Sequence, residues 1–300
     1  MDIKIAHPNG HCEGSINITG SKSETNRLLL LQALFNGFEL KNTSNSDDSK
    51  VMQKALQTSS DRIDIHHAGT AMRFLTAYFS HIQGRSVVLT GSSRMQERPI
   101  QILVDALRDI GASISYEKEE GFPPLKIHGK KLAGGKVELP ADVSSQYISA
   151  LLLLGPVLEQ GLELHLVGKI TSIPYINMTL SLLNSLGVST SFEGQLICVS
   201  PMKEIKKDIQ IVESDWSSAS YFFSIAALSE TAEIHLTSFR KESLQGDSVL
   251  RSIYDNLNVS SHFEGDTLIL KKENKPLPTS LKLDLSKAPD IAQTIAVSCY

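Results

Sequence analysis

Clusters of small hydroxyl residues and cations recur in this chain where a helix is expected to begin. The first is Gly20-Ser21-Lys22-Ser23-Glu24-Thr25-Asn26-Arg27. Free backbone N–H groups at a helix start attract anions, and Ser23 can donate a further hydrogen bond. Lys22 precedes the first turn and Arg27 follows about one turn later, so both can reach a docked phosphate or carboxylate.

A plainer interpretation of this cluster stays open. Ser21 or Ser23 can cap the helix while Lys22 and Arg27 remain solvated surface charges, which is the commoner arrangement. The segment lacks the Gly-x-x-x-x-Gly-Lys-Ser/Thr spacing of the nucleotide-binding loop, so it does not indicate ATP.

The same arrangement returns twice. Ala68-Gly69-Thr70 is followed by Arg73, and Ser144-Ser145-Gln146 is followed by Tyr147. Glycine lets a ligand approach the backbone closely, and the hydroxyls of both clusters are neutral donors. Repetition favours an anion site over simple capping.

Arg94 and Arg98 add two guanidinium groups, which suit bidentate binding of carboxylate or phosphate. Salt bridges, with Glu97 as a partner, are the competing interpretation. Asp290 is most simply a helix-start carboxylate. As a base it would need a raised pKa or a closely held substrate proton, and the sequence shows neither.

The elements that carry these clusters form a repeat. A small-residue or Ser/Thr start, an apolar helix, a polar break and a strand begin at Ser21, Ala68, Ser144, Ser217 and Pro289. Between them lies a second helix that runs into a strand, as in the segment from Ile100. This alternation argues for an α/β architecture of similar modules.

The spacing of the repeats is even except at the beginning. The interval from Ser21 to Ala68 is shorter than the others. It indicates that the first module has lost or shortened its second helix. Because the fifth repeat stops at Tyr300 inside an apolar helix, we expect the chain to be a fragment, truncated at its C-terminus.

Composition limits the classes of function. Three hundred residues suffice for two domains, and a net charge of -4 gives no global attraction for nucleic acid or anionic lipid. Cys12, Cys198 and Cys299 lack metal-ligand or redox spacing, and His66-His67 lacks a His-x-x-x-His partner, so no metal is expected. Without a secretion signal or a membrane-length apolar stretch, the expected location is the cytoplasm.

Several strings together resemble one family. They are GSKSETNR (20–27), AGTAMRFL (68–75), LTGSSRMQERPI (89–100), SSQYISALLL (144–153), TSIPYINMTL (171–180), DWSSASYFF (215–223), LQGDS (244–248) and PDIAQTIAVS (289–298). The chain resembles the enolpyruvyl transferases, and within them the 5-enolpyruvylshikimate-3-phosphate synthases. The strings follow the family's order across essentially the whole chain.

The resemblance implies a two-domain α/β fold, the inside-out α/β barrel of enolpyruvyl transferases, built from repeated helix and strand modules. It places residues 21–212 in one domain and residues 1–20 with 213–300 in a second, incomplete domain. Helix N-termini would converge on the cleft between the domains.

The resemblance also implies an activity and its residues. The family moves the enolpyruvyl group of phosphoenolpyruvate to the 5-hydroxyl of shikimate 3-phosphate and releases phosphate, in the shikimate pathway to chorismate and aromatic amino acids. It uses no metal or organic cofactor, and a monomer is expected. The implied contacts of shikimate 3-phosphate are Lys22, Ser23, Arg27, Ser144, Ser145, Gln146, Ser172, Tyr175 and Asp290. The implied contacts of phosphoenolpyruvate are Lys22, Gly69, Arg98 and Gln146. The implied catalytic residues are Lys22 and Asp290, with Asp290 as the base.

Two departures from the family pattern stand out. His67 occupies the position where the family commonly has Asn before Ala-Gly-Thr-Ala-Met-Arg. The Lys-Glu-Thr-Asp-Arg segment, the later His-Arg pair and a C-terminal Lys that the family carries are absent, so the 300 residues alone are expected to be inactive or nearly so.

Two alternatives remain. A UDP-N-acetylglucosamine enolpyruvyl transferase normally carries a Cys on the loop before the equivalent of Arg98, and Gly91 to Pro99 has none. The other is a non-catalytic phosphate-binding protein of the same fold.

Overall fold

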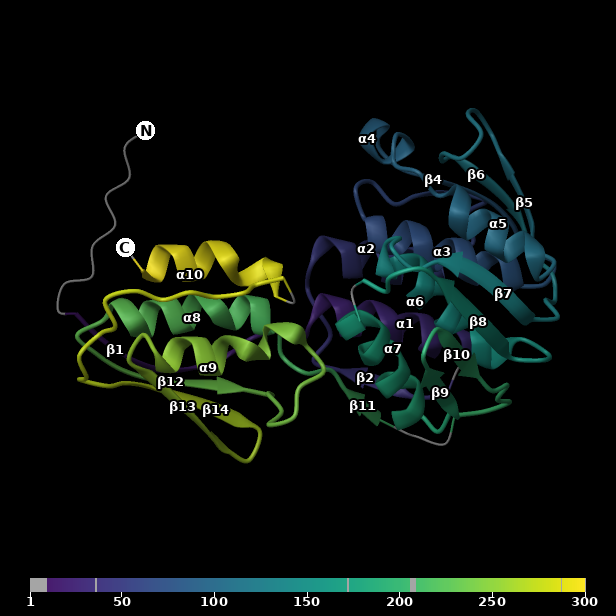
Figure 1. The fold of residues 1–300 in the computed structure, drawn as a ribbon. Coiled ribbons are helices and arrows are strands. Elements are labelled where there is room, and N and C mark those ends of the chain that lie inside the picture. The colour runs from purple at the N-terminus through teal and green to yellow at the C-terminus, as the bar shows by residue number, and fades with distance from the viewer. Residues whose placement is uncertain (1–9, 36, 172, 206–208, 287, 300) are drawn as a thin grey trace. The chain divides into compact units, whose positions relative to one another are not determined.

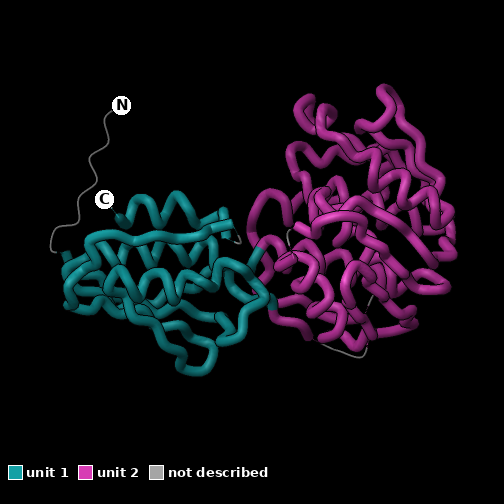
Figure 2. The backbone as a smooth tube through the Cα atoms, in the orientation of Figure 1, with its two compact units in different colours: residues 1–21, 212–300 teal, residues 22–211 magenta. Residues whose placement is uncertain are grey.

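The computed structural model describes residues 10–35, 37–171, 173–205, 209–286 and 288–299. The chain divides into two compact units, which Figure 2 colours separately. One is Lys22–Ile211, and the other combines Met1–Ser21 with Val212–Tyr300. The described helices include none that is long and apolar enough to cross a membrane.

The unit Lys22–Ile211 is built around helices that are buried on all sides. They are α1 (Lys22–Phe35), α3 (Gly69–His81) and α6 (Ser145–Leu154) (Figure 1). Every residue from Glu24 to Leu31 of α1 and from Tyr147 to Leu154 of α6 is buried. The runs of four leucines in both helices explain this, because a helix that is apolar all round must be covered all round.

Further helices surround this centre. They are α2 (Asp47–Gln57), α4 (Ser93–Gln96), α5 (Gln101–Asp109), the short 3-10 helix η1 (Gly155–Val157) and α7 (Ile173–Ser185). The helix α7 packs against α6 and α1, and α2 packs against α1 and α3.

The sheets of the molecule repeat one strand order. In the unit Lys22–Ile211 the strands are β3 (Arg62–Asp64), β4 (Ser86–Thr90), β5 (Ser113–Tyr116) and β6 (Leu125–His128), then β7 (Gly135–Pro140), β8 (Leu162–Val167), β9 (Thr190–Glu193) and β10 (Leu196–Val199). Their orders are β3-β4-β6-β5 and β7-β8-β10-β9. In each sheet the first two strands along the chain are parallel to each other and are connected through a helix. The last two strands form an antiparallel pair. The helix and strand modules inferred from the sequence repeat are therefore real.

The first module differs from the expectation. Its second helix is present as α2, so the inference of a lost or shortened helix was wrong. What it lacks is the antiparallel strand pair: residues 42–61, all described, contain no strand, and among the described strands β2 (Glu39–Lys41) pairs only with β11 (Ile209–Ile211). The missing pair accounts for the short first interval.

The second unit has its helices on one face of a sheet of order β1-β12-β14-β13 (Figure 1). The strands are β1 (His11–Asn17), β12 (Thr231–Thr237), β13 (Val259–Glu264) and β14 (Thr267–Lys272). The helices are α8 (Trp216–Leu228), α9 (Leu250–Asp255) and α10 (Ala292–Ser298), with the 3-10 helices η2 (Gly246–Val249) and η3 (Pro289–Ile291).

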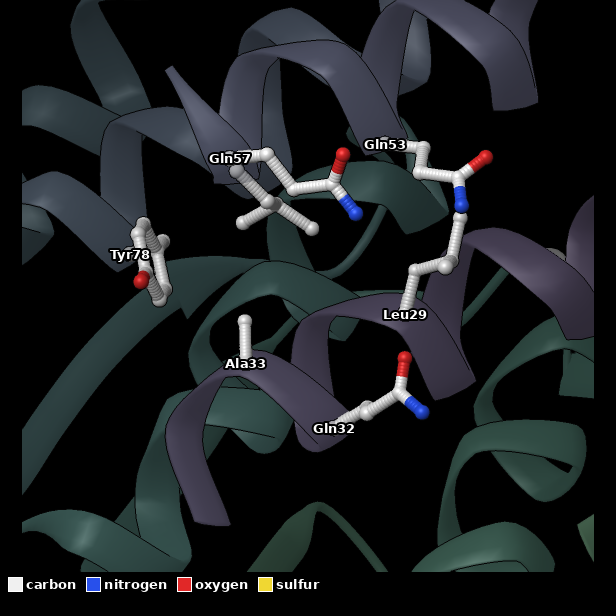
Figure 3. A pocket seen from close by; sticks show the side chains of 7 residues that line it. Leu29, Gln32, Ala33, Gln53, Gln57 and Tyr78 are labelled. Atoms are coloured by element: carbon white, nitrogen blue, oxygen red, sulfur yellow. The ribbon is translucent and has the colours of Figure 1, made fainter. Parts of the chain in front are cut away.

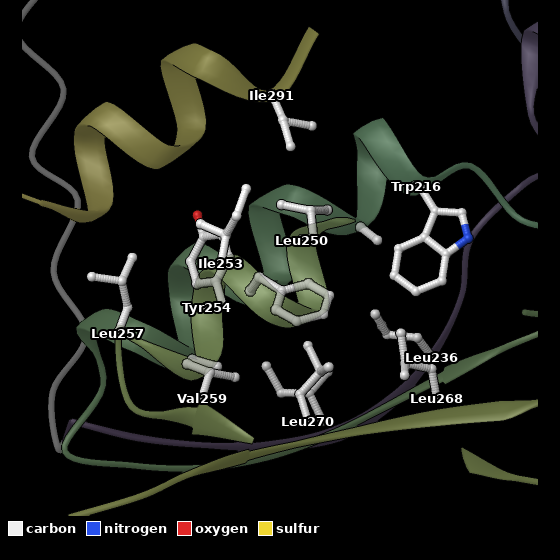
Figure 4. Packing of buried hydrophobic residues seen from close by; sticks show 14 of the residues in the cluster. Trp216, Leu236, Leu250, Ile253, Tyr254, Leu257, Val259, Leu268, Leu270 and Ile291 are labelled. Atoms are coloured by element: carbon white, nitrogen blue, oxygen red, sulfur yellow. The ribbon is translucent and has the colours of Figure 1, made fainter. Parts of the chain in front are cut away.

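The core of this unit lies between the sheet and the helices. Figure 4 shows Trp216, Leu250 and Tyr254 above Leu268 and Leu270 of β14. The Trp216 ring meets Phe239 edge-on, with ring centroids 4.9 Å apart, a geometry that aromatic quadrupoles favour.

Candidate active site

Arg27 is the centre of one polar cluster in the unit Lys22–Ile211. Its guanidinium is 3% exposed and donates from Nε to Thr179 Oγ1 (2.8 Å), from Nη1 to the Ser23 carbonyl (2.8 Å) and from Nη2 to Ser149 Oγ (2.9 Å). These partners lie on α7, α1 and α6, so one side chain connects three helices.

Aromatic rings contribute to the surroundings of Arg27. The guanidinium carbon lies 5.6 Å from the centroid of Phe74 and 6.0 Å from that of Tyr175. Burial lowers the pKa of Arg27 to about 10, against a smaller raising effect of Tyr175 and Glu24. Arg27 is therefore a buried cation and not the solvated surface charge of the plainer interpretation.

Lys22 and Ser23 open α1 beside this cluster. Lys22 is exposed, Ser23 is half-buried, and Lys22 has no hydrogen bond or ion pair to a residue that the structure describes. Ser172, one of the expected contacts, lies outside the described residues. Arg27, Ser23 and Tyr175 are thus brought together, with Lys22 next in sequence.

The start of α6 is held against the start of α3. Ser144 is the N-cap of α6 and accepts from the Gln146 amide at 3.4 Å. The Gln146 side chain donates from Nε2 to Thr70 Oγ1 at 3.2 Å. This bond links the Ser144-Ser145-Gln146 turn to the turn that carries Gly69. The Ala68 N-cap of α3 supplies no side-chain acceptor to the first amides of that helix.

Arg98 lies directly against Gly69. A Cβ built on Gly69 would overlap Arg98 Nη1 and lie 3.1 Å from Cζ. Arg98 also lines a pocket of about 290 Å³ with His67, Arg94 and Met95. Within the described residues neither Arg94 nor Arg98 forms an ion pair, so the expected alternative of a bridge to Glu97 is wrong.

His67 also belongs to this pocket. Its Nδ1 lies 2.7 Å from Ser92 Oγ, the N-cap of α4. The pocket therefore combines two guanidinium groups and an imidazole with no carboxylate among its described lining residues, which suits a small anion.

Arg73 and Tyr147 support the segment that carries Arg98. Arg73 is 3% exposed and donates from Nη1 to the Gly69 carbonyl (3.2 Å) and from Nη2 to the Pro99 carbonyl (3.1 Å). The Tyr147 hydroxyl donates to the same Pro99 carbonyl at 2.5 Å. The sequence pointed to Arg73 as a cation but gave no role to the Tyr147 hydroxyl.

Ser149 and Thr179 are further residues that the motifs did not identify. A hydroxyl inside an apolar helix run is the signal that could have found them, because a buried hydroxyl needs a hydrogen-bond partner. Here the two hydroxyls bond each other at 3.1 Å as well as Arg27.

Asp290 lies in the other unit, in η3, and is exposed. Its charge acts on Asp247, whose pKa is raised first by burial and then by Asp290 and Asp215, against the hydrogen bond from Ser217. Ser217 Oγ donates to Asp247 Oδ2 at 2.5 Å. Three carboxylates therefore gather at the starts of α8, η2 and η3.

Figure 3 shows a different pocket, between α1, α2 and α3, with a volume of about 270 Å³. Its described lining residues carry no formal charge and include Gln32, Gln53, Gln57 and Tyr78. A phosphorylated substrate has no cation to meet there. Among the described residues no group of three or more His, Cys, Asp or Glu side chains could hold a metal ion.

The fold is that of a known structure. It matches the solved structure of EPSP synthase from Acinetobacter baumannii with a TM-score of 0.77, over 95% of this chain and 71% of that one. Sequence identity is 20%, so this likeness establishes the fold alone.

Sequence comparison is more specific. The family model described as EPSP synthase (3-phosphoshikimate 1-carboxyvinyltransferase) matches residues 51–300. The 3-phosphoshikimate 1-carboxyvinyltransferase of Bacteroides fragilis strain YCH46 is 48% identical over 289 residues, which are 96% of this chain and 70% of that protein. That of Buchnera aphidicola subsp. Cinara cedri is 37% identical, over 99% of this chain and 74% of that protein. The chain belongs to the EPSP synthase family.

Proposed function

We propose that this chain is a 3-phosphoshikimate 1-carboxyvinyltransferase of the shikimate pathway, which moves the enolpyruvyl group of phosphoenolpyruvate to the 5-hydroxyl of shikimate 3-phosphate. Family membership supports the assignment. The single structural observation that carries it is the placement of Arg98 against Gly69 at the start of α3, with no carboxylate partner among the residues that the structure describes.

The site for shikimate 3-phosphate is proposed to use Lys22, Ser23, Arg27, Ser144, Ser145, Gln146, Ser172, Tyr175 and Asp290. The described contacts among Ser23, Arg27 and Tyr175 support this set. A sugar-like acid with a phosphate needs both cations and hydroxyl donors, and these residue types supply them.

Phosphoenolpyruvate is proposed to meet Lys22, Gly69, Arg98 and Gln146. The bond between Gln146 and Thr70 holds the start of α6, which carries Gln146, against the start of α3, which carries Gly69. Guanidinium and backbone N–H donors can hold the carboxylate and phosphate and stabilise the charge that develops as the tetrahedral intermediate forms.

The proposed chemistry needs a base and a cation. Asp290 would take the proton of the 5-hydroxyl as that oxygen bonds to C2 of phosphoenolpyruvate and the C2–C3 double bond takes up a proton at C3, which gives the tetrahedral intermediate. That intermediate then loses a proton from C3 as its C2–O bond to phosphate breaks, so the double bond is restored and inorganic phosphate is released. Lys22, the exposed cation at the start of α1, would stabilise negative charge during this exchange.

Further points belong to the same proposal. The two compact units would act as the two domains, the protein would work as a monomer, and it would reside in the cytoplasm with the other soluble enzymes of small-molecule metabolism.

Substrate binding tests the assignment. Binding of the substrates is the deciding measurement. Calorimetric titration should give saturable binding of shikimate 3-phosphate that Arg27→Ala or Ser144→Ala weakens, and no binding of UDP-N-acetylglucosamine. Binding of the nucleotide sugar in place of shikimate 3-phosphate would overturn the proposal.

A further inference from the structure

The carbonyl of Pro99 is held by two side chains from two helices. Arg73 Nη2 on α3 donates to it at 3.1 Å, and the Tyr147 hydroxyl on α6 donates to it at 2.5 Å. Pro99 follows Arg98 directly, so its carbonyl lies one peptide unit beyond the residue proposed to bind phosphoenolpyruvate.

The Arg73 guanidinium also holds the backbone of Gly69, against which Arg98 lies. Its Nη1 donates to the Gly69 carbonyl at 3.2 Å, while the Arg98 guanidinium lies against the Cα of the same Gly69. One planar group therefore ties the backbone of Gly69 to the backbone next to Arg98. A guanidinium can do this because its N–H groups diverge from a rigid plane, whereas an ammonium is a single point.

The surroundings of Arg73 keep it in this position. The side chain is 3% exposed, its guanidinium carbon lies 5.7 Å from the centroid of the Tyr147 ring, and its Nη1 is 3.7 Å from Met95 Sδ. Burial lowers its pKa, the hydrogen bond and charge of Tyr147 oppose that shift, and the positive charge of Arg98 adds to it. No carboxylate among the described residues pairs with it.

We propose that Arg73, with Tyr147, is a positioning residue of this site: it braces the Gly69 and Pro99 carbonyls so that the Arg98 guanidinium stays beside Gly69, ready for the anion of phosphoenolpyruvate. This inference rests on the proposed function of Arg98. Arg73 acts through Arg98 and does not itself contact the substrate.

The test is a titration of the 300-residue chain with phosphoenolpyruvate, in which binding is monitored through the amide NMR signals of Gly69 and Thr70. Arg73→Lys should raise the dissociation constant about 10-fold, since one ammonium cannot bridge both carbonyls. Tyr147→Phe keeps the ring and removes only the hydroxyl. The dissociation constant should then rise by about 3-fold only, because Arg73 still holds the Pro99 carbonyl. Binding of shikimate 3-phosphate should change less than 2-fold, or about 0.4 kcal/mol, in both variants.

Arg108 and Tyr116 provide matched controls in the same unit. Arg108 donates from Nε and Nη2 to the Ile114 carbonyl (3.1 and 2.9 Å), and its guanidinium carbon lies 5.3 Å from the centroid of the Tyr116 ring. Arg108→Lys and Tyr116→Phe thus remove the same chemical groups from the last turn of α5 and from β5. Neither should change the phosphoenolpyruvate titration.

A double-mutant cycle separates positioning from general support of the fold. If Arg73 acts through Arg98, Arg73→Lys should have no further effect on binding in an Arg98→Ala background. An unchanged 10-fold effect in that background, or no effect of Arg73→Lys in the wild type, would overturn the inference. If Arg98→Ala itself leaves phosphoenolpyruvate binding intact, the proposed function of Arg98 fails instead.

Discussion

The Arg98 guanidinium occupies the space where a side chain on Gly69 would lie. An ideal Cβ on Gly69 overlaps Arg98 Nη1 and lies 3.2 Å from Nη2. Glycine at this position is therefore required by the close approach of a cation, not by backbone conformation, because Gly69 is not among the residues with positive φ.

Gly69→Ala should consequently displace Arg98. The arginine is exposed and its side chain can move, so the fold should survive while phosphoenolpyruvate binding weakens by about 10-fold, the equivalent of 1.4 kcal/mol. Calorimetric titration measures this. Gly14→Ala is the control, because a Cβ there meets nothing within 4 Å. Unchanged binding by Gly69→Ala would show that the contact with Arg98 has no role.

Arg27 allows a prediction about both stability and binding. In Arg27→Lys one ammonium replaces donors to Thr179, Ser149 and the Ser23 carbonyl, so buried acceptors lose partners. We expect the free energy of unfolding to fall by about 2 kcal/mol. Urea denaturation measures that change, and calorimetry should show weaker shikimate 3-phosphate binding.

Arg85→Lys is the comparison for Arg27→Lys. Arg85 is half-buried, pairs with the exposed Asp61 at 3.2 Å and donates to the Thr58 and Ser60 carbonyls, all near the surface, where water can replace a lost donor. Arg85→Lys should lower the free energy of unfolding much less than Arg27→Lys does, and it should leave the binding of shikimate 3-phosphate unchanged. Full substrate affinity in Arg27→Lys would identify Arg27 as a structural cation only.

Much of the architecture followed from the sequence because its signals are local. The Leu-rich runs of α1 and α6 marked helices, and the recurring order of helix and strand marked the modules. The α/β class and the family were confirmed. The absence of the strand pair from the first module was not predicted, because a short interval between repeats does not tell which element is missing.

The contacts of the candidate site depended on tertiary structure. Nothing in the spacing of Tyr147 and Pro99, 48 residues apart, indicates a hydrogen bond between them. Likewise, Glu97 is adjacent to Arg98 in sequence and suggested a salt bridge, but the fold directs Arg98 to Gly69. The site residues carried over from the family remain predictions that the binding experiments address.

Glu213 organises the unit that carries Asp290. Its Oε1 accepts from Trp216 Nε1 (2.8 Å) and the Arg240 amide (3.0 Å), and its Oε2 accepts from Ser243 Oγ (2.7 Å) and Gln245 Nε2 (3.3 Å). The residue is 1% exposed. A carboxylate suits this place because it only accepts, and every neighbour named here donates.

Glu213→Gln should therefore be destabilising although it is nearly isosteric. The new amide group directs two N–H donors at groups that already donate, and we expect the free energy of unfolding to fall by about 3 kcal/mol. Urea denaturation measures it, with the exposed Glu230→Gln as control. Equal stability of the two variants would mean that the four bonds contribute little.

Asp247 leads to a prediction of pH dependence. Burial raises its pKa above the ordinary 3.8, and the charges of Asp290 and Asp215 add to the shift. The folded chain therefore keeps this proton to a higher pH than the unfolded chain does. Well below pH 3.8 both states hold the proton and Asp247 costs nothing; as pH rises from 3.8 to the folded pKa, the unfolded chain loses this proton first and the free energy of unfolding falls, and above the folded pKa the cost stays constant.

Asp247→Asn removes that cost while keeping an oxygen that can accept from Ser217. Because Asp247 is only partly buried, solvent screening reduces the effect, and we expect a gain of less than about 1 kcal/mol at pH 7. Urea denaturation at pH 7 and pH 4 should show the gain shrinking at the lower pH, because pH 4 lies close to the ordinary pKa of 3.8, where the difference between the two states begins to vanish. Asp266→Asn, on an exposed turn, should show neither the gain nor its pH dependence. A gain of equal size at both pH values would mean that the substitution acts through packing and not through the charge, since only a titrating carboxylate makes the difference depend on pH.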